Sequence, residues 1–152
     1  MAYSDLRDFI SALEKAGELK RVSLEVDPVL EITEFADRSV KNNGPALLFE
    51  NPKGYSMPVL INAFASQKRM EIALQVDKFQ DIADRITDYL QMQMPQGLMS
   101  KLSMLPKLAE MGSFFAKKVS SGPCKEVIQK DGFNPKEIPV LTCWPQDGGP
   151  FI

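Results

Sequence analysis

The fold is decided by the stretch LKRVSLEVDPVLEITEFADRSVKNNGPALLF, residues 19–49. In its first eight residues Val22, Leu24 and Val26 alternate with polar residues, which predicts a strand with one buried face. Asp27-Pro28 then supplies an N-cap and a proline suited to the first helical position. The last four residues are apolar without alternation, which favours a strand buried on both faces. The stretch therefore predicts strand, helix and strand.

The helix predicted within this stretch has its core face on one side and its charges on the other. The core face consists of Val29, Ile32, Ala36 and Val40, with Phe35 beside it. Glu31, Glu34, Asp37 and Arg38 occupy the opposite side. Paired carboxylates can act as acid and base in catalysis, but Glu34 and Arg38 have the spacing of a solvated helix pair. A solvated face is the better interpretation.

Helices are predicted on both sides of this stretch. Before it, Leu6, Phe9, Ile10 and Leu13 form one apolar stripe, with Ser4 or Asp5 as the cap and Gly17 at the end. After it, a second buried run spans 58–61, and Ser66 caps a short helix. A longer helix is predicted over 77–91, with an apolar stripe of Phe79, Ile82, Ala83, Ile86 and Leu90. The fold class is therefore α/β (α+β), a small mixed sheet with flanking helices.

The rest of the chain is less regular. Residues 92–119 are rich in methionine and broken by proline and glycine, which predicts a helical linker or lid with pieces at 98–105 and 107–118. Simple filling of an irregular core is the favoured explanation of the methionines. The rival is an adaptable apolar surface that packs against the rest of a longer protein or lies near an apolar substrate. Further on, 123–129 is predicted as a strand, 134–137 as a one-turn helix and 138–143 as extended. Trp144 is expected to fill the core or a domain junction.

The composition excludes several kinds of chemistry. The chain has no histidine and only two cysteines, Cys124 and Cys143, so it contains no Ser-His-Asp triad, no Cys-His pair and no four-cysteine zinc site. Both cysteines are expected to be free thiols. The net charge of −2 argues against a nucleic-acid partner, and the polar N-terminus without a signal-peptide pattern predicts a cytoplasmic protein.

No active site can be assembled from the residue pattern alone. Asn51-Pro52-Lys53-Gly54 lacks the glycine spacing of a phosphate-binding loop, and Gly148-Gly149 fits a tight turn before a strand. The chain ends on Phe151-Ile152, which reads as the opening of a strand. This ending indicates the front part of a longer protein.

Several long strings, which together cover most of the chain, point to a known family. They are YSDLRDFI (3–10), GELKR (17–21), DPVLEITEFADR (27–38), GPALLFENPKGY (44–55), GPC (122–124) and IPVLTCWP (138–145). These strings resemble the start of the UbiD family of decarboxylases that depend on prenylated FMN, typified by 3-octaprenyl-4-hydroxybenzoate carboxy-lyase. The resemblance is weakest over 67–118.

The resemblance implies three regions and no catalytic group. It implies an N-terminal α/β domain over 1–91, the helical linker over 92–119, and the first strands of a truncated split β-barrel of the flavin-binding type over 120–152. The family's phosphate, metal and catalytic residues lie farther along. No catalytic, cofactor-binding or metal residue is therefore assigned here, and this fragment is expected to bind no cofactor and to be inactive alone.

For a full-length protein, the resemblance implies a carboxy-lyase in the cytoplasm that uses prenylated FMN with a divalent metal (Mn) and a K ion as a further candidate. The substrate would be an aromatic or α,β-unsaturated acid, with 3-polyprenyl-4-hydroxybenzoate of ubiquinone biosynthesis as the leading candidate. Its partners would be the remainder of its own chain, further copies in a homo-oligomer and, for a polyprenylated substrate, a nearby membrane surface. The alternative is a non-catalytic binding or assembly module that shares the family's N-terminal domain.

Overall fold

The computed structural model describes residues 3–91, 104–116, 118–128, 130, 132 and 134–150. Two compact units make up the chain. One combines Met1–Ala83 with Asn134–Ile152, and the other is Asp84–Phe133. They are called unit 1 and unit 2 below, and each is described by itself. The division into domains 1–91, 92–119 and 120–152 stays a prediction.

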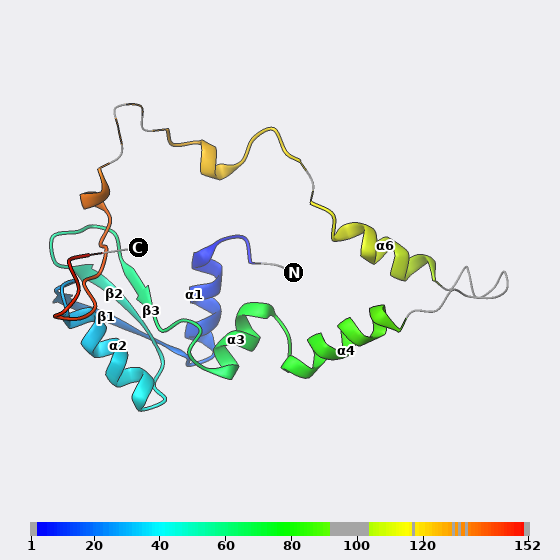
Figure 1. The fold of residues 1–152 in the computed structure, drawn as a ribbon, viewed down its shortest axis with the longest axis horizontal. Helices are drawn as coiled ribbons and strands as arrows, with labels where there is room; N and C mark the ends of the chain where they lie inside the picture. The colour runs from blue at the N-terminus through cyan, green and yellow to red at the C-terminus, as the bar shows by residue number, and fades with distance from the viewer. Residues whose placement is uncertain are drawn as a thin grey trace. The chain divides into compact units, whose positions relative to one another are not determined.

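Unit 1 is built around a three-stranded mixed sheet of strand order β1-β2-β3 (Figure 1). β1 (Leu19–Val26) and β2 (Ala46–Pro52) are parallel, and α2 (Glu31–Lys41) connects them. β3 (Val59–Ile61) runs antiparallel to β2. The fold class predicted from the sequence, a mixed sheet with flanking helices, is confirmed.

Helices cover both faces of this sheet. On one face, Ile32 of α2 packs against Val26, Leu47 and Phe49. The opposite face carries α1 (Leu6–Lys15) and α3 (Gln67–Leu74), with a core of Phe9, Leu13 and Ala46. Residues 46–49 of β2 are all buried, as expected for a central strand that is covered on both sides.

The predicted caps of α1 and α3 are confirmed. The Asp5 carboxylate accepts hydrogen bonds from the backbone N–H groups of Arg7 and Asp8, and the Ser66 hydroxyl accepts one from Arg69. These oxygens satisfy donors that a helix N-terminus leaves unpaired.

The predicted start of α2 is wrong by several residues. Asp27 does not cap this helix; its carboxylate accepts from the N–H of Val29 and so closes a local turn. The helix begins only at Glu31, after Leu30 adopts a positive φ of 71°. Because the helix starts late, Val29 lies outside it, and Ile32 and Ala36 are its buried residues. Val29, Val40 and Phe35 are about half exposed.

β1 contains a bulge that the alternating pattern did not reveal. Val22 pairs with Phe49, but Glu25 pairs with Asn51, so three steps along β1 match two steps along β2. A bulge inserts one residue and locally disrupts the ladder, while Val26 beyond it still packs with Leu47 and Phe49, as Val22 does. Leu24 was predicted on the buried face and is instead 75% exposed.

Unit 2 contains the end of the long predicted helix. That helix, α4 (Phe79–Leu90), spans the division between the units, and α6 (Leu105–Ser113) belongs to unit 2. Within unit 2, Arg85 pairs with Glu110 at 2.7 Å and lies over the ring of Phe114. None of the described side chains of α4 is buried, although its predicted stripe was expected to be.

The later part of the chain holds two single turns of 3-10 helix, Pro123–Lys125 and Pro135–Glu137. The strand predicted over 123–129 is wrong, because its described residues contain only the first of these turns. The one-turn helix predicted at 134–137 is confirmed, with Asn134 as its cap. The helical piece predicted at 98–105 lies mostly outside the described residues.

Candidate functional site

A groove of about 970 Å³ in unit 1 is the candidate site. It lies between β1, the first turn of α2 and the segment Cys143–Pro145. Ligand sites in proteins typically have this volume and a mainly apolar lining. Its apolar lining residues are Val22, Leu24, Val26, Leu30, Phe35, Leu47, Trp144 and Pro145.

The third wall of the groove is anchored to the N-terminal part of the chain through Thr142. The N–H of Leu30 donates to the carbonyl of Thr142 at 2.9 Å, and the N–H of Thr142 donates to that of Pro28 at 3.3 Å. Asp147 then fixes the turn that follows, because its carboxylate accepts from the N–H groups of Cys143 and Trp144. These bonds hold Trp144 at the groove with 52% of its surface exposed.

This position of Trp144 rules out the first of the two expectations, that it fills the core, and leaves the second, a domain junction, as a prediction. The indole forms part of an open wall, and Phe35 across the groove is about half exposed as well. Large aromatic side chains that remain in contact with water on a concave surface are typical of sites that another molecule or segment covers.

Leu30 is the strained residue of the groove. The N–H of Glu31 donates to the carbonyl of Val29 at 2.9 Å, which closes a three-residue turn around Leu30 at φ 71° and ψ −39°. Turns of this kind are rare and costly for a residue with a side chain, and such strain concentrates at functional sites.

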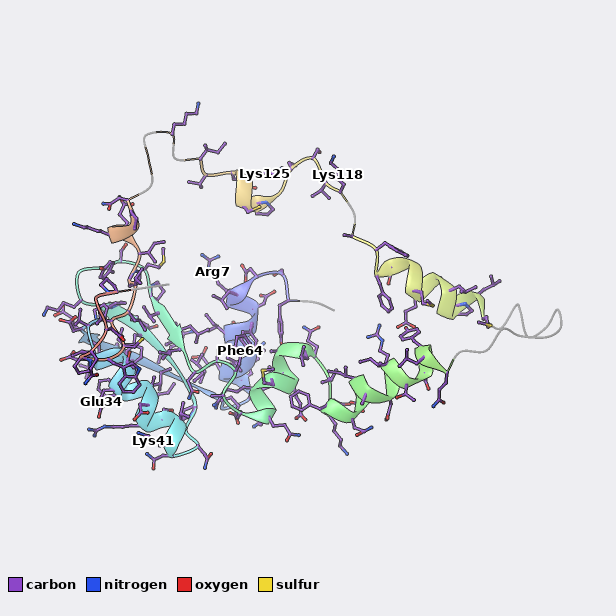
Figure 2. The ribbon with its side chains drawn as sticks, viewed as in Figure 1. Arg7, Glu34, Lys41, Phe64, Lys118 and Lys125 are labelled. Carbon is purple, nitrogen blue, oxygen red and sulfur yellow. The ribbon has the colours of Figure 1, made fainter. Side chains whose placement is uncertain are left out.

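The charged residues around the groove differ in how far they are already paired. Glu34 lies on α2 (Figure 2). It forms an exposed ion pair with Arg38 at 2.6 Å, as the spacing predicted. Arg21 is bound by both oxygens of Glu14 and by Glu50, and these hydrogen bonds raise the pKa of its guanidinium. Among the described ion pairs, neither Lys20 nor Glu25 takes part, and both line the groove.

Asp27 and Lys53 form a further ion pair, with 2.9 Å between Oδ2 and Nζ. The hydrogen bond from the N–H of Val29 and the pair with Lys53 lower the pKa of the Asp27 carboxyl. Lys53 belongs to residues 51–54, which the sequence suggested form an ordinary turn rather than a phosphate-binding loop. The positive φ of 82° at Gly54 and the pairing of Lys53 with Asp27 agree with that interpretation.

A buried arginine in α3 was missed from the sequence. Arg69 is 2% exposed, and its guanidinium donates to Glu18 and to the carbonyl of Gly44, both at 3.0 Å. Helical spacing carries the signal that could have found it, since Arg69 precedes the core residues Ile72 and Ala73 by three and four positions. The pair joins α3 to the start of β1 and so supports the sheet from the side opposite the groove.

The described residues offer no metal site. Within the described ranges no three histidine, cysteine, aspartate or glutamate side chains come together in a way that could hold a metal ion. Cys124 and Cys143 are free thiols, as predicted. We therefore derive no metal-dependent or catalytic step from these side chains. No helix in the described part of the chain is long and apolar enough to cross a membrane.

Comparison with known proteins decides the family. The model for the 3-octaprenyl-4-hydroxybenzoate carboxy-lyase N-terminal domain matches residues 10–86, and the model for the Rift-related domain of the same carboxy-lyase matches residues 117–152. The chain belongs to the UbiD family. An uncharacterized protein of Archaeoglobus fulgidus is 47% identical over all 152 residues, which make up 31% of its length.

Solved structures of UbiD-class enzymes share the fold. HmfF from Pelotomaculum thermopropionicum, in an evolved dimeric form in complex with prFMN, has a TM-score of 0.66 and 27% identity over 97% of this chain and 30% of its own. Vanillic acid decarboxylase from Sedimentibacter hydroxybenzoicus, in its closed form, has a TM-score of 0.70 and 27% identity over 98% of this chain and 29% of its own. The UbiD-family chain therefore spans about 30% of the length of these relatives.

Proposed function

We propose that these 152 residues are the N-terminal part of a non-oxidative decarboxylase that acts on an aromatic or α,β-unsaturated carboxylic acid. The observation that carries the proposal is the match of both family models, one over 10–86 and the other over 117–152. The HmfF structure with prFMN supports prenylated FMN as the cofactor. In such an enzyme the cofactor supplies the electron sink for loss of carbon dioxide, and the protein binds and orients it.

The finer assignments belong to the same proposal. The leading substrate is 3-polyprenyl-4-hydroxybenzoate of ubiquinone biosynthesis, with Mn and K as the ions of the full-length, cytoplasmic, homo-oligomeric enzyme. A polyprenylated substrate would bring that enzyme close to a membrane surface. The 152 residues would contribute packing and docking surface, and the groove beside β1 is an open surface in unit 1.

The test compares two preparations supplied with prenylated FMN and Mn. Release of carbon dioxide from hydroxybenzoate-type and cinnamate-type acids is expected from the product of the gene's whole reading frame and not from residues 1–152 alone. Release by the 152-residue chain would contradict the proposal that it is inactive. A stop codon directly after Ile152 would favour the non-catalytic assembly module instead.

A further inference from the structure

The outer edge of β1 is open. In the described part of the chain, β1 is the first strand of the sheet and pairs only with β2. An open edge presents backbone donors and acceptors to any strand that fits. Leu24, the most exposed apolar side chain of β1, lies at this edge and lines the groove.

The bulge makes this edge self-complementary in charge. Lys20 pairs with Leu47 and Glu25 pairs with Asn51, and these partners are four residues apart in β2. Residues four apart in a strand lie on the same face, so Lys20 and Glu25 also share a face. In a regular strand their odd separation would place them on opposite faces.

The same register defines a centre of symmetry for β1. The ladder runs from Leu19 opposite Ala46 to Val26 opposite Pro52, and its middle position is Val22 opposite Phe49. Counted along this ladder, Lys20 lies two positions before Val22, and Glu25 lies two positions after it because the bulge adds one residue. If a second β1 is laid antiparallel with the two Val22 residues opposite each other, Lys20 of each copy lies opposite Glu25 of the other. Opposite charges at directly opposed positions stabilise an antiparallel pair, and the two-fold axis produces each contact twice.

We propose that the outer edge of β1 pairs with β1 of a second copy of this chain, antiparallel about Val22, and joins two three-stranded sheets into one. Lys20 and Glu25 carry charges of opposite sign and take part in none of the described ion pairs. The second copy provides each of them with a side chain of opposite charge. The pairing covers Leu24 and the β1 side of the groove. A foreign strand without this order of charges would be disfavoured, so the edge selects its own copy.

The inference specifies a surface for the proposed homo-oligomer and does not depend on decarboxylation. Its failure leaves the carbon dioxide assay unaffected, and failure of that assay leaves this surface unaffected.

The experiment measures association of the 152-residue chain by sedimentation velocity. At concentrations up to about 500 µM, dimers with a Kd near 100 µM are well populated. We expect Lys20→Glu and Glu25→Lys each to weaken association about tenfold or more, because each places two pairs of like charges in contact. The double variant K20E/E25K restores association, and an equimolar mixture of the two single variants forms a heterodimer.

Matched controls are Lys136→Glu and Glu137→Lys, which make the same charge changes at exposed residues of unit 1 outside β1. Circular dichroism confirms folding of each variant, and both β1 positions are exposed. The proposal is overturned by a monomeric wild-type chain, by association that Lys20→Glu and Glu25→Lys leave unchanged, by failure of the mixture to associate, or by equal loss in the controls.

Discussion

Among single residues, Arg69 is the one whose environment differs most from what its side chain prefers. Its charge is buried and is compensated by Glu18 and the carbonyl of Gly44. A Cβ at position 44 would lie 2.7 Å from the hydroxyl oxygen of Ser39, so glycine lets the segment that carries this carbonyl lie close to the end of α2. Burial of a charge is tolerated only with such partners, so the site depends on all of them together.

Replacement of Arg69 by methionine is therefore expected to lower the free energy of unfolding by about 2–3 kcal/mol, because Glu18 and the Gly44 carbonyl lose a buried donor. Urea denaturation measures the change. Arg38→Met, which removes the exposed pair with Glu34, serves as the control and should cost less than about 0.5 kcal/mol. Equal losses in the two variants would show that burial of Arg69 is unimportant.

Asp27 gives a pH dependence with a definite sign. Its pKa in the folded chain is below the ordinary value of 3.8, so its contribution to stability is present above pH 3.8 and is lost as the pH falls through the folded pKa. We expect Asp27→Asn to lower the Tm at neutral pH, with the difference from wild type shrinking below pH 3.8. Glu137→Gln, at an exposed turn, is the control. A difference that stayed constant with pH would refute the assignment.

At the scale of elements, local sequence signals were sufficient wherever short-range chemistry decides the structure. The cap of α1, the Ser66 cap of α3 and the apolar run of β2 were predicted correctly. Of the predicted α1 stripe, Phe9 and Leu13 are buried, whereas Leu6 is exposed. The start of α2 was predicted wrongly. The Asp27 carboxylate could either cap the helix or close a local turn, and it closes the turn by accepting from the N–H of Val29. The bulge in β1 arises from pairing with β2, which no local pattern reports.

The candidate site was missed for the same reason. Its walls come from β1, α2 and Cys143–Pro145, and the last of these is brought to the others by the bridge between Val29 and Thr142 and by packing of Leu141 on the core. The sequence indicated each piece as ordinary strand, helix or extended chain. Arg69 differs, because helical spacing placed it on the core side of α3.

The structure predicts unequal losses of unfolding free energy for two truncations to alanine in the sheet, at Phe49 and at Leu24. Phe49 is fully buried and should lose about 3–5 kcal/mol of unfolding free energy on replacement by alanine. Leu24→Ala should lose less than about 0.5 kcal/mol in dilute, monomeric solution, since the bulge turns its side chain to solvent. Denaturation midpoints for both variants provide the measurement. A cost for Leu24→Ala close to that of Phe49→Ala would mean that β1 has no bulge.

At the scale of the whole molecule, the two units differ in how much they bury. All the apolar side chains of the described core belong to unit 1, whereas the described residues of unit 2 are exposed or partly exposed. Backbone hydrogen bonds that are not covered by buried apolar side chains open more readily.

Amide hydrogen exchange should therefore be about 100-fold faster or more in Leu105–Ser113 of unit 2 than in Ala46–Pro52 of unit 1. Mass spectrometry of peptides from the 152-residue chain measures both in one sample. Leu6–Lys15 is a helix of unit 1 with buried side chains on one face, so comparison with it separates the effect of burial from that of helical structure. Similar protection in all three segments would mean that the chain opens as one cooperative body.

The half-exposed indole at the groove also makes the molecule its own optical reporter. The chain contains a single tryptophan, so its fluorescence spectrum comes from Trp144 without interference from any other indole. A molecule or strand that covers the groove would remove water from this ring and shift its emission to shorter wavelength. Quenching by a small solute such as acrylamide would weaken at the same time. Ligands and partners can thus be screened on the unlabelled chain.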